Sequence, residues 1–131
     1  MRPAGDVFRE TARETLVAIS NLDMHTKNLG LLHQASGEVS LAPAYDPVPM
    51  AHHGDADGKT ALAVNKKYRH AEITRADLVA EMQTWGVRRP GQVVDATLGR
   101  LDEIVAHEQP LDGAHPRLQE AIVQFIRNLR G

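Results

Sequence analysis

The sequence predicts a single α+β domain, mainly α, over residues 1–131. Three observations favour this class. The chain is long enough to bury one hydrophobic core but too short for two. Apolar residues recur every three to four positions through several segments, which is the period of amphipathic helices. With one Trp, two Tyr and two Phe, the core has to be built mainly from aliphatic side chains, as in packed helices.

The first half of the chain predicts one helix, one hairpin and one long loop. Residues 6–20 have the helical period and lead into the polar stretch "NLDMHTKN" at 21–28. Residues 29–42 predict a β-hairpin, because "LGLLH" and "VSLAP" flank a Ser-Gly turn. Residues 43–60 hold three prolines and two glycines without a period, which indicates a long irregular loop. A short strand is expected at residues 61–64, "ALAV".

The helical part is predicted to span residues 74–130. Thr74 is a good N-cap, with Asp77 three residues further on, and an apolar stripe that includes Trp85 ends at Gly86. We expect the side chains of this stripe, Trp85 among them, to face the core. The basic run "KKYRH" at 66–70 is interpreted as a solvated turn.

Two further helices are expected after this one. Pro90 can occupy the first position of a helix, and the apolar spacing carries that helix to about His107. The stretch "EQPLDGAHP" then interrupts the pattern. The last helix follows Pro116, with one apolar side.

Composition excludes several classes of protein. Fifteen Lys and Arg against seventeen Asp and Glu leave a formal charge of -2, so direct nucleic-acid binding is not expected. Without cysteine there is no disulfide framework or thiolate zinc site, and any metal must take oxygen or imidazole ligands. No segment is apolar enough for a signal peptide or a membrane span, which predicts a soluble, cytoplasmic chain.

The polar stretch contains a pattern typical of phosphoryl transfer. Asp23 and Asn28 are spaced as D-x-x-x-x-N, as in the kinase catalytic loop, where the Asp receives the proton of the substrate hydroxyl and the Asn holds a magnesium ion. A second isolated acid, Asp46, follows the predicted hairpin. Amide and carboxylate oxygens are suitable ligands for Mg²⁺.

The stretch "NLDMHTKNLGLL" followed by "VSLAPAYDPVP" resembles the C-terminal lobe of the HipA-type serine/threonine kinases, the toxins of bacterial toxin–antitoxin systems. The resemblance runs from about Phe8 to His107 and is strongest over residues 21–48. It implies a protein-kinase-like C-terminal lobe, in which a short β-hairpin leads to the metal-binding Asp46 and a helical bundle follows.

The resemblance also implies roles for individual residues. Asp23 would be the catalytic base, and Asn28 and Asp46 would bind ATP through Mg²⁺. The other residues implied to line the nucleotide site are His25, Lys27 and Tyr45. The complete enzyme would transfer the γ-phosphate of ATP to a Ser or Thr hydroxyl.

The implied partners are a protein substrate, with an aminoacyl-tRNA synthetase as one candidate, and a helix-turn-helix antitoxin of the HipB type. A kinase also needs an N-terminal lobe with a glycine-rich loop and a phosphate-binding lysine. Only 22 residues precede Asp23, with Gly5 as their single glycine, so this lobe is expected to be missing and the chain to be inactive alone. Two alternatives stay open: a non-catalytic interaction module or truncated remnant, and the C-terminal half of a split kinase.

A second polar cluster, "HHGDADG", lies in the predicted loop. Its imidazoles and carboxylates could bind a metal ion, but their spacing matches no zinc template. A solvated loop is the favoured interpretation. The residues concerned are His52, His53, Asp55 and Asp57.

Overall fold

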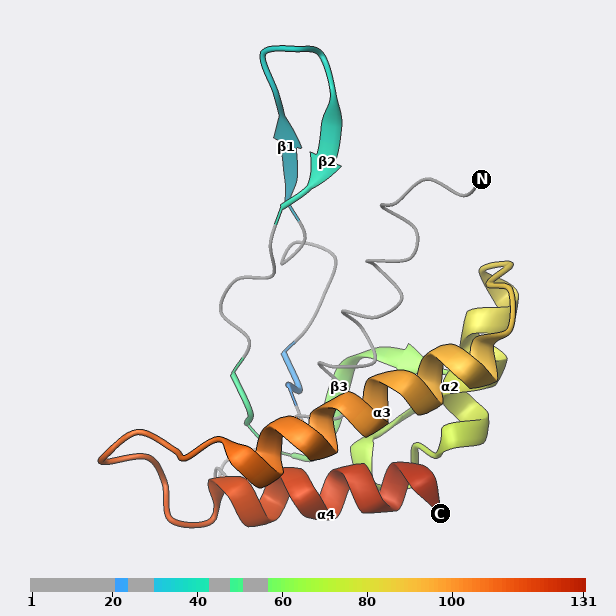
Figure 1. Ribbon diagram of the computed structural model, residues 1–131. Helices are drawn as coiled ribbons and strands as arrows, with labels where there is room; N and C mark the ends of the chain where they lie inside the picture. Colours follow the sequence, from blue (N-terminus) through green and yellow to red (C-terminus); the bar gives the residue numbers. More distant parts are fainter. Residues whose placement is uncertain (1–20, 24–29, 43–47, 51–56) are drawn as a thin grey trace.

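The computed structural model describes residues 21–23, 30–42, 48–50 and 57–131 (Figure 1). The helix expected over residues 6–20 lies outside these ranges. The described residues form two small β-hairpins and three α-helices, the α+β composition that the sequence predicts. Along the chain the elements are β1 (Leu31–His33), β2 (Val39–Leu41), β3 (Lys59–Val64), β4 (Lys67–Arg69), the short 3-10 helix η2 (His70–Glu72), α2 (Arg75–Thr84), α3 (Pro90–His107) and α4 (Leu118–Arg130).

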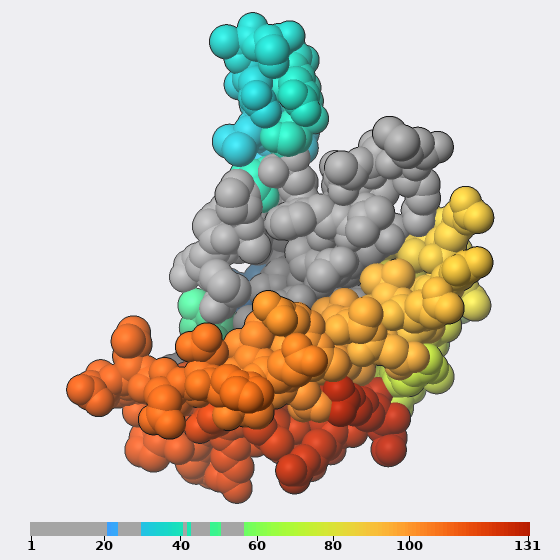
Figure 2. Space-filling model, viewed as in Figure 1, coloured from blue at the N-terminus to red at the C-terminus, as the bar shows by residue number. Residues whose placement is uncertain are grey.

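The first hairpin, β1–β2, is antiparallel and confirms the prediction for residues 29–42. Gly37 in its turn has φ 83°, a left-handed conformation that glycine adopts without a steric penalty. Figures 1 and 2 show this hairpin projecting away from the helices. The large apolar side chains Leu31, Leu32 and Val39 are therefore exposed.

The second hairpin, β3–β4, turns at Asn65 and Lys66, which both have positive φ, as in the tight turns that suit the twist of paired strands. The strand expected at 61–64 is confirmed and starts earlier, at Lys59. The interpretation of residues 66–70 as a solvated turn is correct only for Lys66, which is exposed in the turn. Lys67–Arg69 is strand β4, and His70 is buried.

The surroundings of His70 explain its burial. Its ring packs edge-on against Phe125 of α4, with ring centroids 4.2 Å apart. This contact joins the end of the second hairpin to the last helix. Because its two residues are far apart in sequence, no local pattern could have predicted it.

The three predicted helices are confirmed, and α3 begins at Pro90 and ends at His107 as expected. The expectation that Trp85 faces the core is wrong, because its side chain is 37% exposed. Helix α2 ends at Thr84, and Gly86, with φ 70°, turns the chain away from the apolar face of the helix. Val87, just beyond the turn, is buried instead.

The core lies where β3, α2, α3 and α4 meet. Figure 1 shows α3 and α4 lying side by side, with α2 near the start of α3. On the exposed surface, Nε of Arg75 in α2 lies 2.7 Å from Oδ1 of Asp95 in α3. Such exposed ion pairs contribute little to stability. The largest fully buried side chains are Ile73, Met82, Leu98, Ile126, Leu129, Val64 and Val94.

No helix among the described residues is long and apolar enough to cross a membrane.

Candidate functional site

Asp23, the predicted catalytic base, lies within the described residues and is exposed. Its backbone N–H donates a hydrogen bond to Oδ1 of Asn21, 3.2 Å away, which closes a small turn of the kind that Asn side chains favour. The carboxylate of Asp23 is thus accessible to a substrate, as a proton acceptor has to be. The other predicted site residues lie outside the described ranges: His25, Lys27, Asn28, Tyr45 and Asp46.

Leu22 anchors the chain directly before Asp23. Its side chain is 7% exposed, and its carbonyl oxygen accepts a hydrogen bond from the backbone N–H of Ala61 in β3, at 2.8 Å. Strand β3 in turn places Val64 in the core. The backbone at Asp23 is therefore held on the folded body while its carboxylate faces solvent, and a catalytic group needs both properties.

The second hairpin is held in place at its turn and at β4 by a buried carboxylate. We call this group the Asp77 clamp, and it consists of Asp77, Lys67, Asn65 and Thr74. Lys67 Nζ donates to Oδ2 of Asp77 at 2.7 Å, and Asn65 Nδ2 donates to Oδ1 at 2.9 Å. The backbone N–H and the hydroxyl of Thr74 also donate to Oδ2. The backbone N–H of Asn65 donates to Glu81 Oε2 at 2.8 Å. The turn of the second hairpin is thereby fixed to α2.

The clamp changes the acidity of its carboxyl group. Burial alone would raise the pKa of Asp77, but the hydrogen bonds from Lys67, Asn65 and Thr74 together outweigh burial and hold this pKa far below its ordinary value. Asp77 is therefore ionised throughout the neutral range. Its place in the fold gives it a structural role, supporting the strand that anchors Leu22.

We expect Leu22→Ala to lower the free energy of unfolding by about 2–3 kcal/mol, because it leaves a cavity beside β3. Leu31→Ala is the matched control, since that leucine is 54% exposed on the first hairpin, and we expect it to cost less than about 0.5 kcal/mol. Urea denaturation followed by circular dichroism measures both. Equal effects of the two substitutions would show that Leu22 is not an anchor.

The described residues contain no group of three or more His, Asp or Glu side chains placed to hold a metal ion. In the second polar cluster, Asp57 is within the described part and is engaged locally. Its Oδ1 accepts the backbone N–H of Lys59 at 2.9 Å, and its Oδ2 lies 3.8 Å from Lys59 Nζ. The remaining residues of that cluster lie outside the described ranges: His52, His53 and Asp55.

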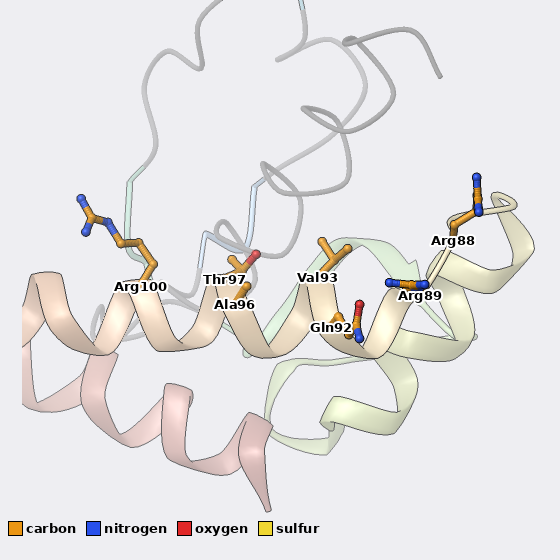
Figure 3. A pocket seen from close by; sticks show the side chains of 7 residues that line it. All are labelled: Arg88, Arg89, Gln92, Val93, Ala96, Thr97 and Arg100. Carbon is orange, nitrogen blue, oxygen red and sulfur yellow. The ribbon is translucent and has the colours of Figure 1, made fainter. Parts of the chain in front are cut away.

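An arginine-lined cavity of about 450 Å³ lies along the first half of α3 (Figure 3). Sequence reasoning missed it. The available signal was the pair of arginines before Pro90, followed by Arg100 on the same helix, but only the fold shows that these side chains share one face. The residues of this arginine cavity are Arg88, Arg89, Gln92, Val93, Ala96, Thr97 and Arg100.

A small α+β unit with an exposed acid before a projecting hairpin, and a helical bundle after it, is the arrangement expected for a HipA-type C-terminal domain. The family of HipA-like C-terminal domains matches this chain over residues 7–108. The chain belongs to that family. Searches of curated proteins and of solved structures found no match.

Proposed function

We propose that this chain supplies the catalytic loop and the metal-binding acid of a HipA-like serine/threonine kinase in a toxin–antitoxin system. The supporting observation is the family match over residues 7–108, which contains the motif "NLDMHTKN" and Asp46 in the expected order. Hairpin β1–β2 lies between these two segments of the chain. In kinases the base and the metal-binding acid are brought together across such a connection.

In this proposal Asp23 accepts the proton of the attacking Ser or Thr hydroxyl. Its exposed position is suited to this role. Asn28 and Asp46 would hold Mg²⁺ through amide and carboxylate oxygens, the donor types that this ion prefers. Bound Mg²⁺ would neutralise charge on the phosphates of ATP. His25, Lys27 and Tyr45 would line the nucleotide and phosphate site.

The proposal includes an N-terminal lobe, supplied by another part of the protein or by a second chain. Phosphoryl transfer depends on positioning and electrostatic stabilisation, and in kinases the glycine-rich loop and its lysine supply part of both. The 131-residue chain alone is thus proposed to bind nucleotide weakly and to transfer no phosphate. Its further partners would be a helix-turn-helix antitoxin of the HipB type and a cytoplasmic protein substrate, with an aminoacyl-tRNA synthetase as one candidate.

A titration of Mg²⁺ and ATP into the chain, followed by backbone amide NMR shifts, tests whether this half-site is preformed. We expect localised, magnesium-dependent shifts at Asp23, Asn28 and Asp46, because the oxygen ligands should bind the metal–phosphate complex even without the other lobe. Asp46→Ala should remove the shifts. Asp57→Ala is the matched control and should leave them unchanged.

If millimolar Mg²⁺ and ATP caused no change in the amide shifts, a preformed half-site would be contradicted. The chain by itself would then be better explained as a non-catalytic interaction module, although its family would be unchanged.

A further inference from the structure

The arginine cavity carries positive charge that is only partly compensated among the described residues. The described residues that line it include three arginines and no carboxylate. Among the described residues, Arg88 and Arg89 have no acidic partner. Nη1 of Arg100 lies 3.5 Å from Oε2 of Glu103, and Arg75 and Arg130 are also paired with acids on α3. The small apolar side chains Val93 and Ala96 also line the cavity. The cavity therefore suits a partner with an apolar tip and carboxylates beside it.

A surface with these complementary properties lies at the other end of α3. We call residues 108–112, "EQPLD", the acidic leucine loop. Leu111 is 87% exposed, more than any other large apolar side chain of the described part. Glu108 and Asp112 on either side of it are exposed and have no cationic partner among the described residues. Figures 1 and 2 show the loop projecting beyond the end of α3.

The cavity and the loop of one molecule cannot meet. Helix α3 has 18 residues and is about 27 Å long. Except for Arg100, the cavity residues on this helix lie on its first half, and the loop follows its last turn. In a two-fold pair of antiparallel α3 helices, however, each loop would lie beside the cavity of the other copy, and the same contact would form twice. Both contact surfaces of each copy are then occupied, so the assembly stops at a dimer.

We propose that the arginine cavity binds the acidic leucine loop of a second copy of this chain, forming a symmetric dimer along α3. In this contact Leu111 of the second copy would lie against Val93 and Ala96, and Glu108 and Asp112 would lie beside the arginines of the cavity. The contact thus pairs opposite charges and apolar side chains at once.

A duplex nucleic acid is a less suitable occupant. It would meet the three arginines but would leave Val93, Ala96 and Leu111 without an apolar contact. The chain also has a formal charge of -2, which opposes binding to a phosphate backbone.

Sedimentation velocity of the full 131-residue chain measures the proposed dimer. We expect reversible association with a Kd on the order of 10–100 μM, typical of a small transient interface. R88E/R89E and E108R/D112R should each weaken self-association at least about tenfold, because each places like charges opposite one another. Leu111→Ser should weaken it without changing charge.

A mixture of the two charge-reversed variants is the decisive sample. In a two-fold pair, both contacts again join opposite charges, so the mixture should dimerise although neither variant does alone. K66E/R127E makes the same change of charge elsewhere on the surface and should leave the dimer intact. Circular dichroism verifies that each variant is folded.

Three outcomes would overturn the proposal. The wild-type chain could stay monomeric up to about 1 mM, well above the Kd of a specific weak contact. The mixture could associate no better than its components. K66E/R127E could weaken association as much as R88E/R89E. None of these measurements depends on ATP binding or phosphate transfer, so they are independent of the proposed kinase function.

Discussion

Asp77→Ala is expected to lower the free energy of unfolding by about 3 kcal/mol, because groups around a buried charge lose their acceptor. Lys67, Asn65 and Thr74 all donate to this carboxylate, and the substitution leaves them in the same space without it. Urea denaturation at neutral pH measures the change. Asp95→Ala, at an exposed ion pair, should cost no more than about 1 kcal/mol. Similar losses for the two variants would contradict the structural importance of the clamp.

The same carboxylate should make stability depend on pH. Hydrogen bonds hold the pKa of Asp77 in the folded state well below its ordinary value of 3.8, despite burial. A group with a lowered folded pKa binds a proton more readily in the unfolded chain, so its stabilisation is fully present above about pH 4–5 and is lost as the pH falls toward the folded pKa.

Urea midpoints between about pH 6 and pH 2 follow this loss directly. In Asp77→Asn, which has no titrating group at this position, stability should decrease less steeply over that window than in the wild type. If the urea midpoints of Asp77→Asn and the wild type fell equally steeply with pH, other carboxylates would be the cause of the pH dependence of stability. Asp95→Asn gives the contribution of an exposed carboxyl, whose pKa is lowered by its hydrogen bond with Arg75.

In a kinase completed with its N-terminal lobe, Asp23→Asn is expected to lower the rate of phosphate transfer by about 10²–10⁴-fold, the range of a general base. The amide keeps the size of the side chain but cannot accept the proton of the hydroxyl. Nucleotide affinity should change little, because the proposed metal ligands are Asn28 and Asp46. Single-turnover transfer and nucleotide binding separate the two effects.

Asp57→Asn is the control, because Asp57 is engaged with Lys59 and has no proposed role in transfer. If Asp23→Asn kept the rate within about twofold, Asp23 would not be the base. If it reduced nucleotide binding as strongly as transfer, its role would be in the binding site. Loss of transfer alone would support the proposed mechanism.

The secondary structure of the second half could be predicted because its signals are local. The pairing of Thr74 with Asp77 marks the start of α2, and Pro90 marks the start of α3. A Ser-Gly turn between two apolar segments was sufficient to place the first hairpin. Each of these signals depends on neighbours within a few residues.

The errors concern residues whose environment is set by distant parts of the chain. Lys67 looks like part of a solvated basic run, but its ammonium group reaches Asp77 on the next helix. His70 is polar in sequence, yet it is buried against Phe125. Trp85 has the helical spacing of a core residue, but the helix ends one residue before it.

In the candidate site, too, some features follow from local sequence and others depend on distant parts of the chain. Asp23 could be proposed from a pattern in the sequence, its spacing to Asn28 together with the later Asp46. Leu22, which holds the chain beside it, is one apolar residue in a polar stretch, and its importance depends on a hydrogen bond from β3. The arginine cavity depends on a helical face that no linear motif describes.

The family match stops at residue 108, but the hydrophobic core does not. Ile126 and Leu129 of α4 are among its most deeply buried side chains, and they lie beyond the matched stretch. The stretch that the family model covers is therefore shorter than the stretch that builds the core. A domain boundary drawn from the family alone would separate α3 from the helix that covers it, so the boundary should be taken from the packing.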